Sequence, residues 1–149
     1  MNLPPGYRLS DDKAELQLDV VHGFLANSYW SPGIPCAIVE RAIEHSWCVG
    51  GFAPDGAQVA FARLVTDHAT FAYLCDVFVL PEARGLGLSK AIVGFFTAHS
   101  RLQNLRRWML ATRDAHSLYA QFGYCPIDDD QAGRLMLRLD PDVYLRMRQ

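Results

Sequence analysis

The densest run of hydrophobic residues in the chain extends from Phe71 to Leu80, and Asp76 is its only charged residue. An apolar run without alternation predicts a strand that is covered on both faces, at the centre of a sheet. Pro81 lacks an amide hydrogen and is expected to end this strand. After the turn Arg84–Gly87, apolar residues recur at helical spacing over 88–96, which predicts a helix. We therefore expect a central strand, a tight turn and a helix in direct succession.

The residues before this strand predict two helices and a series of antiparallel strands. Apolar residues at helical spacing predict helices over 16–27 and 34–45. Strands are expected over 47–52 and 59–66, and an Asp-Gly step between them is typical of a hairpin. A short first strand is expected over 7–9. Together with the central strand, the hairpin predicts three antiparallel strands in a row.

The residues after the long helix predict a change in strand direction. Residues 107–112 form the next expected strand, and a strand, helix, strand unit implies parallel pairing with a right-handed crossover. Asp114 is expected to cap a short helix over 115–122, which Gly123 ends. A last strand is predicted over 135–139. The expected fold class is α/β, or more strictly α+β with one mixed sheet.

Length and charge limit the kind of protein. The chain has 149 residues, half of them hydrophobic, which predicts one domain over residues 1–149. Fourteen basic and sixteen acidic residues give a net charge of −2, so a nucleic-acid partner is not expected. No apolar run approaches the roughly 20 residues of a membrane span, and the chain starts without a basic, apolar leader. We expect a cytoplasmic protein, either a monomer or a homodimer, without a membrane partner.

The cysteines and histidines do not predict a metal site. The four cysteines form no CxxC pair, and we expect reduced thiols in the core. They are Cys36, Cys48, Cys75 and Cys125. Glu44, His45 and Cys48 are of metal-ligand types, but they lie across a predicted helix end and strand start, so a chance cluster is favoured. No metal is predicted.

The turn before the long helix has the properties of an anion site. The first amide groups of a helix have no intrahelical acceptor, and the positive end of the helix dipole lies behind them. Gly85 and Gly87 have no side chain, so a ligand can approach the backbone there. The glycines complete neither GxGxxG nor GxxxxGK[ST], which disfavours a nucleotide site.

Two segments together resemble the GCN5-related N-acetyltransferase (GNAT) superfamily. They are VFVLPEARGLGLSKAIV, which is similar to that family's strand and RxxGxG/A pyrophosphate loop, and DAHSLYAQFGY, which is similar to its ALYxxGF segment. The resemblance implies a GNAT-like fold, with antiparallel N-terminal strands and then a parallel, splayed pair of strands around a central helix. It also implies that acetyl-CoA, as co-substrate, lies between the splayed strands.

The resemblance implies two groups of cofactor-binding residues. The backbone of Phe78, Val79 and Leu80 would lie beside the pantetheine arm, and the turn with the start of the helix would line the pyrophosphate. The pyrophosphate residues would be Arg84, Gly85, Leu86, Gly87, Leu88, Ser89 and Lys90. Two positions depart from the family pattern. Ser89 stands where glycine or alanine is usual, and its hydroxyl can donate to phosphate; Thr112 stands where many members have asparagine.

Acetyl transfer from a thioester to an amine needs a neutral amine, a donor for the thioester oxygen and a proton for the departing thiolate. The resemblance implies that the Val79 amide is the oxyanion donor and that Tyr119 is the proton donor. A phenol has an ordinary pKa of about 10. Tyr119 could instead only hydrogen-bond the sulfur, or pack in the core as a helix-face aromatic.

The residues that would contact the acceptor amine are less clearly indicated by the sequence than the cofactor-binding residues. A buried carboxylate must pair, accept hydrogen bonds or titrate upward, so Asp76 could be a base acting through water, a ligand of the substrate ammonium or a structural group. Tyr29 and Trp30 lie in a turn-rich loop, where they could wall the acceptor pocket or cover the edge of the core.

The predicted function is acetyl-CoA-dependent N-acetyl transfer to a primary amine of a small molecule or peptide. The transfer would be direct, in a ternary complex. The alternative is a non-catalytic acyl-CoA-binding sensor or regulatory module with the same fold.

Overall fold

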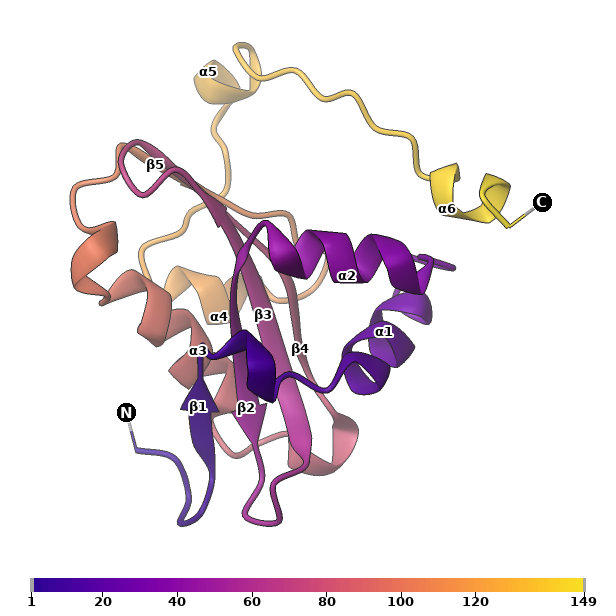
Figure 1. Cartoon of the computed structure of the whole chain (residues 1–149). Helices are drawn as coiled ribbons and strands as arrows, with labels where there is room; N and C mark the ends of the chain where they lie inside the picture. Colours follow the sequence, from indigo (N-terminus) through magenta and orange to yellow (C-terminus); the bar gives the residue numbers. More distant parts are fainter. Residues whose placement is uncertain (1, 149) are drawn as a thin grey trace.

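The computed structural model describes residues 2–148, and its centre is one five-stranded sheet in the order β1-β2-β3-β4-β5 (Figure 1). The strands are β1 Arg8–Ser10, β2 Trp47–Phe52, β3 Gln58–Thr66, β4 Phe71–Val79 and β5 Arg107–Met109. The first four pair antiparallel, and β4 pairs parallel with β5. The mixed α/β fold and the change of strand direction are therefore confirmed.

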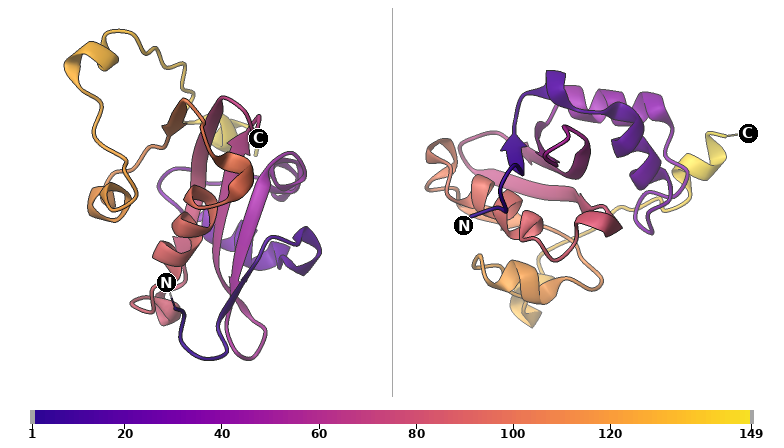
Figure 2. Two further views of the ribbon diagram at one scale, coloured as in Figure 1. Left: turned by 90° about the vertical axis from the view of Figure 1, so that its left-hand side faces the viewer. Right: turned by 90° about the horizontal axis from the view of Figure 1, so that it is seen from below.

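Helices cover both faces of the sheet (Figure 2). The α-helices are α1 Leu18–Ala26, α2 Cys36–Glu44, α3 Leu88–Thr97, α4 His116–Ala120, α5 Asp129–Ala132 and α6 Val143–Arg146; the short 3-10 turns are η1 Lys13–Glu15, η2 Pro81–Ala83 and η3 Ser100–Leu102. One apolar cluster packs α1 and α2 against Phe61 and Phe78. The other packs α3 and Tyr119 against the opposite face. The central strand is thus covered on both sides, as its apolar run predicts.

The two central strands separate along their length. β5 pairs with β4 only at Phe71, Ala72 and Tyr73, whereas β4 continues to Val79. The predicted proline stop is confirmed, since Pro81 begins η2 directly after the strand. On the other side, the register between β3 and β4 shifts next to Asp76, whose φ of 56° is left-handed. This bulge interrupts the regular pairing with β3, while β4 itself runs unbroken from Phe71 to Val79.

Of the predictions for the C-terminal third, one strand is shorter than expected and two predictions are wrong. The strand expected over 107–112 ends at Met109. Asp114 makes no capping bond; the hydroxyl of Thr112 accepts from the amide of Ala115 instead, at 3.0 Å. The strand expected over 135–139 is not formed: the segment is extended but lies beside no other strand, and Leu137 is 83% exposed. A strand forms only where a neighbouring strand can hydrogen-bond its backbone groups, and the alternation of apolar residues over 135–139 does not provide such a neighbour.

The cysteine prediction holds for two of four residues. All four are free; Cys48 is buried and Cys75 half-buried, but Cys36 and Cys125 are exposed, contrary to the expected core position. Among residues 2–148, no helix is both long and apolar enough to cross a membrane.

Candidate active site

A cavity of about 840 Å³ opens where β4 and β5 separate. Its walls come from four parts of the chain: the loop after α1, the second half of β4, the turn that leads into α3, and the loop that leads from β5 into α4. The side chains that line the cavity include Tyr29, Trp30, Asp76, Ser89, Arg113 and Tyr119. The cavity therefore brings together residues that are distant in the sequence.

The end of β4 presents the backbone amide of Val79 to this cavity. The amide of Leu80 donates to the carbonyl of Val59 at 2.8 Å, so it points toward β3. Because backbone groups alternate between the two sides of a strand, the amide of Val79 points toward the gap. The carbonyl of Val79, on the same side, accepts from Nε of Arg84 at 3.1 Å.

Of the three residues expected beside a pantetheine arm, Val79 is thus the one whose N–H is directed into the gap. The side chain of Phe78 lies toward α1, where it stacks on Phe24 with ring centroids 4.1 Å apart, and both rings belong to the wall of the cavity. Leu80 is half-buried and uses its N–H within the sheet. The three predicted residues are therefore adjacent in sequence, but their backbone and side-chain groups point to different sides of β4.

The turn before α3 has an open, glycine-lined surface. Gly85 and Gly87 have φ of 79° and 85°, and a Cβ added at either would meet no atom within 4 Å. The first intrahelical bond of α3 runs from Ala91 to the carbonyl of Gly87, which leaves the amides of the preceding residues without a helical acceptor. Ser89 lines the cavity. This surface fits an anion at the start of the helix.

The other residues of the turn differ in their side-chain environment. Leu88 is buried in the core, so only its backbone can face a ligand, and Leu86 packs partly against the same cluster. Arg84 and Lys90 are exposed. The cationic side chains are thus accessible while the apolar ones tie the turn to the core.

Tyr119 projects from α4 into the wall of the cavity and is 9% exposed. Burial, followed by the proximity of Tyr29 and Asp114, raises the pKa of its phenol to about 12. The phenol is therefore a hydrogen-bond donor at neutral pH.

Asp76 is not a lone carboxylate. Its Oδ2 accepts from Nε of Arg63 at 2.8 Å, and its Oδ1 accepts from Nε1 of Trp30 at 2.9 Å. Arg63 also donates to the hydroxyl of Ser46 at 3.0 Å. Burial of the charge is thus compensated by an ion pair and a neutral donor.

Tyr29 joins two walls of the cavity. Its hydroxyl accepts from the amide of Arg113 at 3.2 Å, and the guanidinium of Arg113 lies 3.9 Å from the centroid of its ring. Its ring also meets Trp30 edge-on, with centroids 5.0 Å apart. Trp30 and Tyr29 remain 39% and 45% exposed, so these aromatics line an opening and do not close the core.

The model of the acetyltransferase (GNAT) family matches residues 19–124. The chain belongs to the GNAT family. A Gibberella zeae protein whose name places it among acetyltransferases is 30% identical over 135 residues, covering 77% of this chain and 76% of its own length.

Solved structures agree with this GNAT assignment. One solved structure is of a Xanthomonas campestris pv. campestris protein whose name places it among the GNAT-family acetyltransferases, and it is 50% identical to this chain. The two structures match with a TM-score of 0.88, over 96% of this chain and 99% of that one. A Clostridium acetobutylicum protein solved with acetyl-CoA shares the fold, with a TM-score of 0.63, 15% identity and coverage of 90% and 94%.

Two residues at this GNAT site are absent from the sequence-based set: Arg113, which lines the cavity, and Arg63, which lies behind the wall and pairs with Asp76. Arg63 lies in β3, and the register that pairs it with Cys75 places it beside Asp76. An arginine within an otherwise apolar predicted strand is a signal that could have identified it. Arg113 follows β5 directly, and no local pattern distinguishes it from the other arginines.

Within residues 2–148, no group of three or more acidic, histidine or cysteine side chains could hold a metal ion. The cations that face the cavity are arginines, Arg84 and Arg113. The local chemistry of the cavity is therefore that of hydrogen bonds, aromatic rings and guanidinium groups.

We expect Asp76→Asn to lower the free energy of unfolding by about 2–3 kcal/mol, because it leaves the charge of Arg63 partly buried and uncompensated. The side chains of Arg63 and Asp76 are only 20% and 9% exposed. Asparagine tolerates the left-handed φ of this position, so backbone strain does not change. Urea unfolding followed by tryptophan fluorescence measures the difference. The control is Glu15→Gln, which removes the more exposed ion pair with Arg8 and should leave the free energy of unfolding nearly unchanged; equal losses would contradict the buried pair.

Proposed function

We propose that this GNAT protein transfers an acetyl group from acetyl-CoA directly to a primary amine of a small molecule or peptide. The observation that carries the proposal is the gap between β4 and β5. At one end of it lies the open glycine turn of α3, and along it the amide of Val79 and the phenol of Tyr119 reach the same cavity. Acyl transfer requires one donor for the carbonyl oxygen of the thioester and one for its sulfur, on the two sides of the C–S bond that breaks.

The residues present fit acetyl-CoA as co-substrate. The turn Arg84–Gly87 and the first amides of α3 would hold its pyrophosphate, since no side chain occupies the space over Gly85 and Gly87. When bound, the cofactor supplies the activated acetyl group. No metal is required by this arrangement.

Val79 and Tyr119 would act on opposite sides of the thioester. The amide of Val79 would donate to the carbonyl oxygen, where negative charge develops. Tyr119, with a pKa of about 12, is a weaker acid than a thiol with an ordinary pKa of about 8.5, and full proton transfer would cost roughly 5 kcal/mol. Tyr119 would therefore stabilise the departing sulfur mainly by a hydrogen bond.

Asp76 would orient the acceptor side of the cavity. Each of its oxygens accepts one bond, from Arg63 or from Trp30, and a carboxylate oxygen has a further lone pair. Asp76 would hold Trp30 as a wall of the acceptor pocket and accept a hydrogen bond from the incoming amine. Tyr29 would form the adjoining wall.

The acceptor would be a small amine or a peptide terminus in the cytoplasm, where free thiols such as the exposed Cys36 and Cys125 stay reduced. An α-amine needs less help than a lysine side chain: loss of its proton at neutral pH costs about 1 kcal/mol, against about 4–5 for lysine. The scarcity of a strong base in the cavity favours the former.

The proposal is tested by measuring thiol release from acetyl-CoA over a panel of amines, with calorimetry of acetyl-CoA binding on the same preparation. The panel contains amino acids, short peptides, lysine derivatives and amino sugars. We expect binding and turnover with at least one class of primary amine. Tight binding without turnover on the whole panel would support the sensor alternative, and absence of binding would contradict both functions.

A further inference from the structure

Arg113 is a cation in the wall of the central cavity that has no anionic partner within residues 2–148. In that part of the chain its guanidinium donates no hydrogen bond, and the one bond that Arg113 donates comes from its backbone amide. The neighbouring Asp114 also lines the cavity but forms no ion pair with it. A guanidinium has five N–H donors in a planar fork that matches a carboxylate. Arg113 can therefore receive an anionic group of a ligand.

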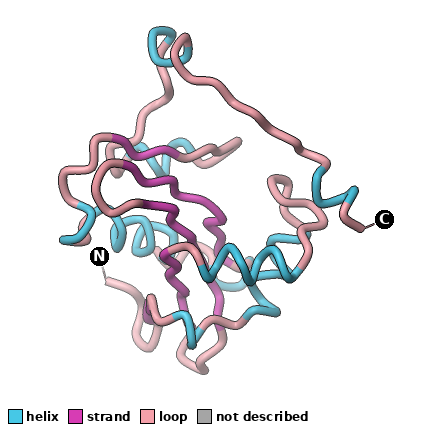
Figure 3. The backbone as a smooth tube through the Cα atoms, turned by 45° about the horizontal axis from the view of Figure 1, so that its top comes forward, coloured by secondary structure: helices cyan, strands magenta, loops and turns pink. Residues whose placement is uncertain are grey.

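Tyr29 holds this guanidinium in place. The central carbon of the guanidinium lies 3.9 Å from the centroid of the tyrosine ring, and the amide of Arg113 donates to the hydroxyl of the same tyrosine at 3.2 Å. The two residues belong to different segments, 27–35 and 110–115, which Figure 3 draws as loops. Stacking on an aromatic face leaves the N–H groups of a guanidinium free to donate. A ligand would thus meet a cation that is already positioned.

A carboxylate faces the same cavity from β4. Asp76 accepts a hydrogen bond from Trp30 at 2.9 Å, and the ring of Trp30 meets that of Tyr29 edge-on, with centroids 5.0 Å apart. Trp30 therefore holds the carboxylate and Tyr29 holds the guanidinium, as adjoining parts of one wall. This arrangement matches a molecule that carries an amine and, a short distance away, a carboxylate.

The wall beside these two charged groups is aromatic. Phe24 and Phe78 line the cavity together with Tyr29 and Trp30. Phe24 stacks on Phe78 with centroids 4.1 Å apart and lies 6.2 Å from the ring of Trp30, so the rings form a continuous surface. Such a surface favours an apolar or aromatic group on the ligand, because both sides then lose contact with water.

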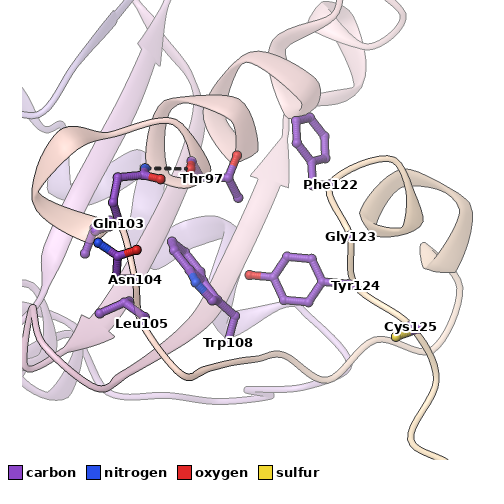
Figure 4. Close-up of a pocket in the computed structure, with 10 residues that line it drawn as sticks. Thr97, Gln103, Asn104, Leu105, Trp108, Phe122, Gly123, Tyr124 and Cys125 are labelled. Carbon is purple, nitrogen blue, oxygen red and sulfur yellow. Dashed lines mark hydrogen bonds between the residues drawn. The ribbon is translucent and has the colours of Figure 1, made fainter.

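A second cavity, of about 390 Å³, has a different lining (Figure 4). Its residues, 97, 102–105, 108 and 122–125, include no charged side chain, and none of them lines the central cavity. Its polar groups are amides and hydroxyls, such as Asn104 and the hydroxyl of Tyr124, which is turned toward Trp108 in Figure 4. A charged ligand would lose hydration there without gaining an ion pair. A ligand with two charges is therefore expected in the central cavity.

We propose that the acceptor is an amino acid or short peptide with an apolar side chain and a free carboxylate, and that Arg113 selects it by binding this carboxylate. The inference rests on the proposed function, because it names the amine that would receive the acetyl group. The amine would lie beside Asp76. The neutral amine forms the amide bond to the acetyl carbon as the C–S bond breaks, and the proton that it loses balances the departing thiolate. Arg113 determines specificity and takes no part in these bond changes.

The test compares the wild type with Arg113→Gln on two pairs of acceptors: L-phenylalanine and its carboxamide, and phenylalanylglycine and its carboxamide. For at least one pair, we expect the wild-type kcat/KM to be about 100-fold higher for the acid, because two charge-assisted hydrogen bonds contribute about tenfold each. Arg113→Gln should remove most of this preference and leave the carboxamide rate unchanged. Comparison of the two proteins cancels the difference in amine pKa between acid and carboxamide. The pair with the larger preference distinguishes a site for one residue from a site for two.

The matched control is Arg106→Gln. Arg106 is exposed and lies outside the cavity, so this variant loses the same charge but should keep the preference for the acid. Calorimetry should give Arg113→Gln the acetyl-CoA affinity of the wild type. Circular dichroism checks that both variants fold.

A wild type without preference for either acid would overturn the inference. Equal losses for acid and carboxamide in Arg113→Gln would reduce Arg113 to a support for Tyr29, and weaker acetyl-CoA binding would assign it to the cofactor; both results would also overturn it. Calorimetry of the acids on CoA-saturated protein separates the inference from the proposed function. Binding of an acid that depends on Arg113, without transfer, would contradict the transfer alone. Transfer to amines without the preference would contradict the inference alone.

Discussion

Gly87→Glu is expected to abolish acetyl-CoA binding, with a loss of affinity of about a thousandfold or more. The substitution places a side chain and a negative charge in the open space at the start of α3. Losing two charge-assisted hydrogen bonds there would cost about 4 kcal/mol before any repulsion. Isothermal calorimetry with acetyl-CoA measures the loss.

The control is Gly56→Glu in the hairpin between β2 and β3. Gly56 has a φ of 88°, close to the 85° of Gly87, and likewise no atom within 4 Å of an added Cβ. Both variants therefore carry the same left-handed strain, about 1–2 kcal/mol, and the same added charge. Only Gly87→Glu should lose binding. If affinity survives in Gly87→Glu, the cofactor lies elsewhere; if both variants lose it, the loss reflects folding.

Tyr119→Phe is expected to lower turnover by about tenfold to a hundredfold while acetyl-CoA affinity stays unchanged. A hydrogen bond to a group that becomes charged is worth about 1.5–3 kcal/mol, and the phenol would make its bond mainly as the sulfur departs. A loss confined to kcat is the signature of an interaction made in the transition state. Steady-state thiol release, beside calorimetry of cofactor binding, separates the two effects.

Two observations check the interpretation of that loss. Tyr7→Phe removes a hydroxyl from another tyrosine that packs against the same core cluster but lies outside the cavity, and it should leave turnover unchanged. Wild-type turnover should also not decline as the pH passes the ordinary tyrosine range near 10, because burial raises the pKa of Tyr119 to about 12. Full activity of Tyr119→Phe would remove Tyr119 from the mechanism, whereas a decline near 10 that is absent from Tyr119→Phe would contradict the raised pKa of Tyr119.

The part of the fold that the sequence predicts well is the part with local signals. The apolar run of β4, its proline stop and the helical periodicity of α3 specify their elements through neighbours in the chain. The Asp-Gly hairpin between β2 and β3 is of the same kind. The glycine turn was likewise identified from residue types, because left-handed φ and an open surface are properties that glycine alone readily combines.

Within the candidate site, the glycine turn was recognisable from local residue types, whereas the surroundings of Asp76 were not. Asp76 was correctly singled out as a group that must be compensated, but its partners are a residue of β3 and a residue of the loop after α1. Neither is near it in sequence. The register of two strands and the packing of a loop decide such pairs, and no local pattern contains either.

The sequence by itself determined the central strand, the glycine turn, the long helix and the likeness to GNAT proteins, because each depends on residue types at short spacing. Tertiary structure alone decided which way the amides at the end of β4 point, how the charge of Asp76 is balanced, and whether the segment Leu135–Leu139 has a neighbour. Its alternating leucines are those of a strand, yet pairing is a property of two segments. Within residues 2–148 no other strand lies beside this segment, so Leu137 and Leu139 stay exposed.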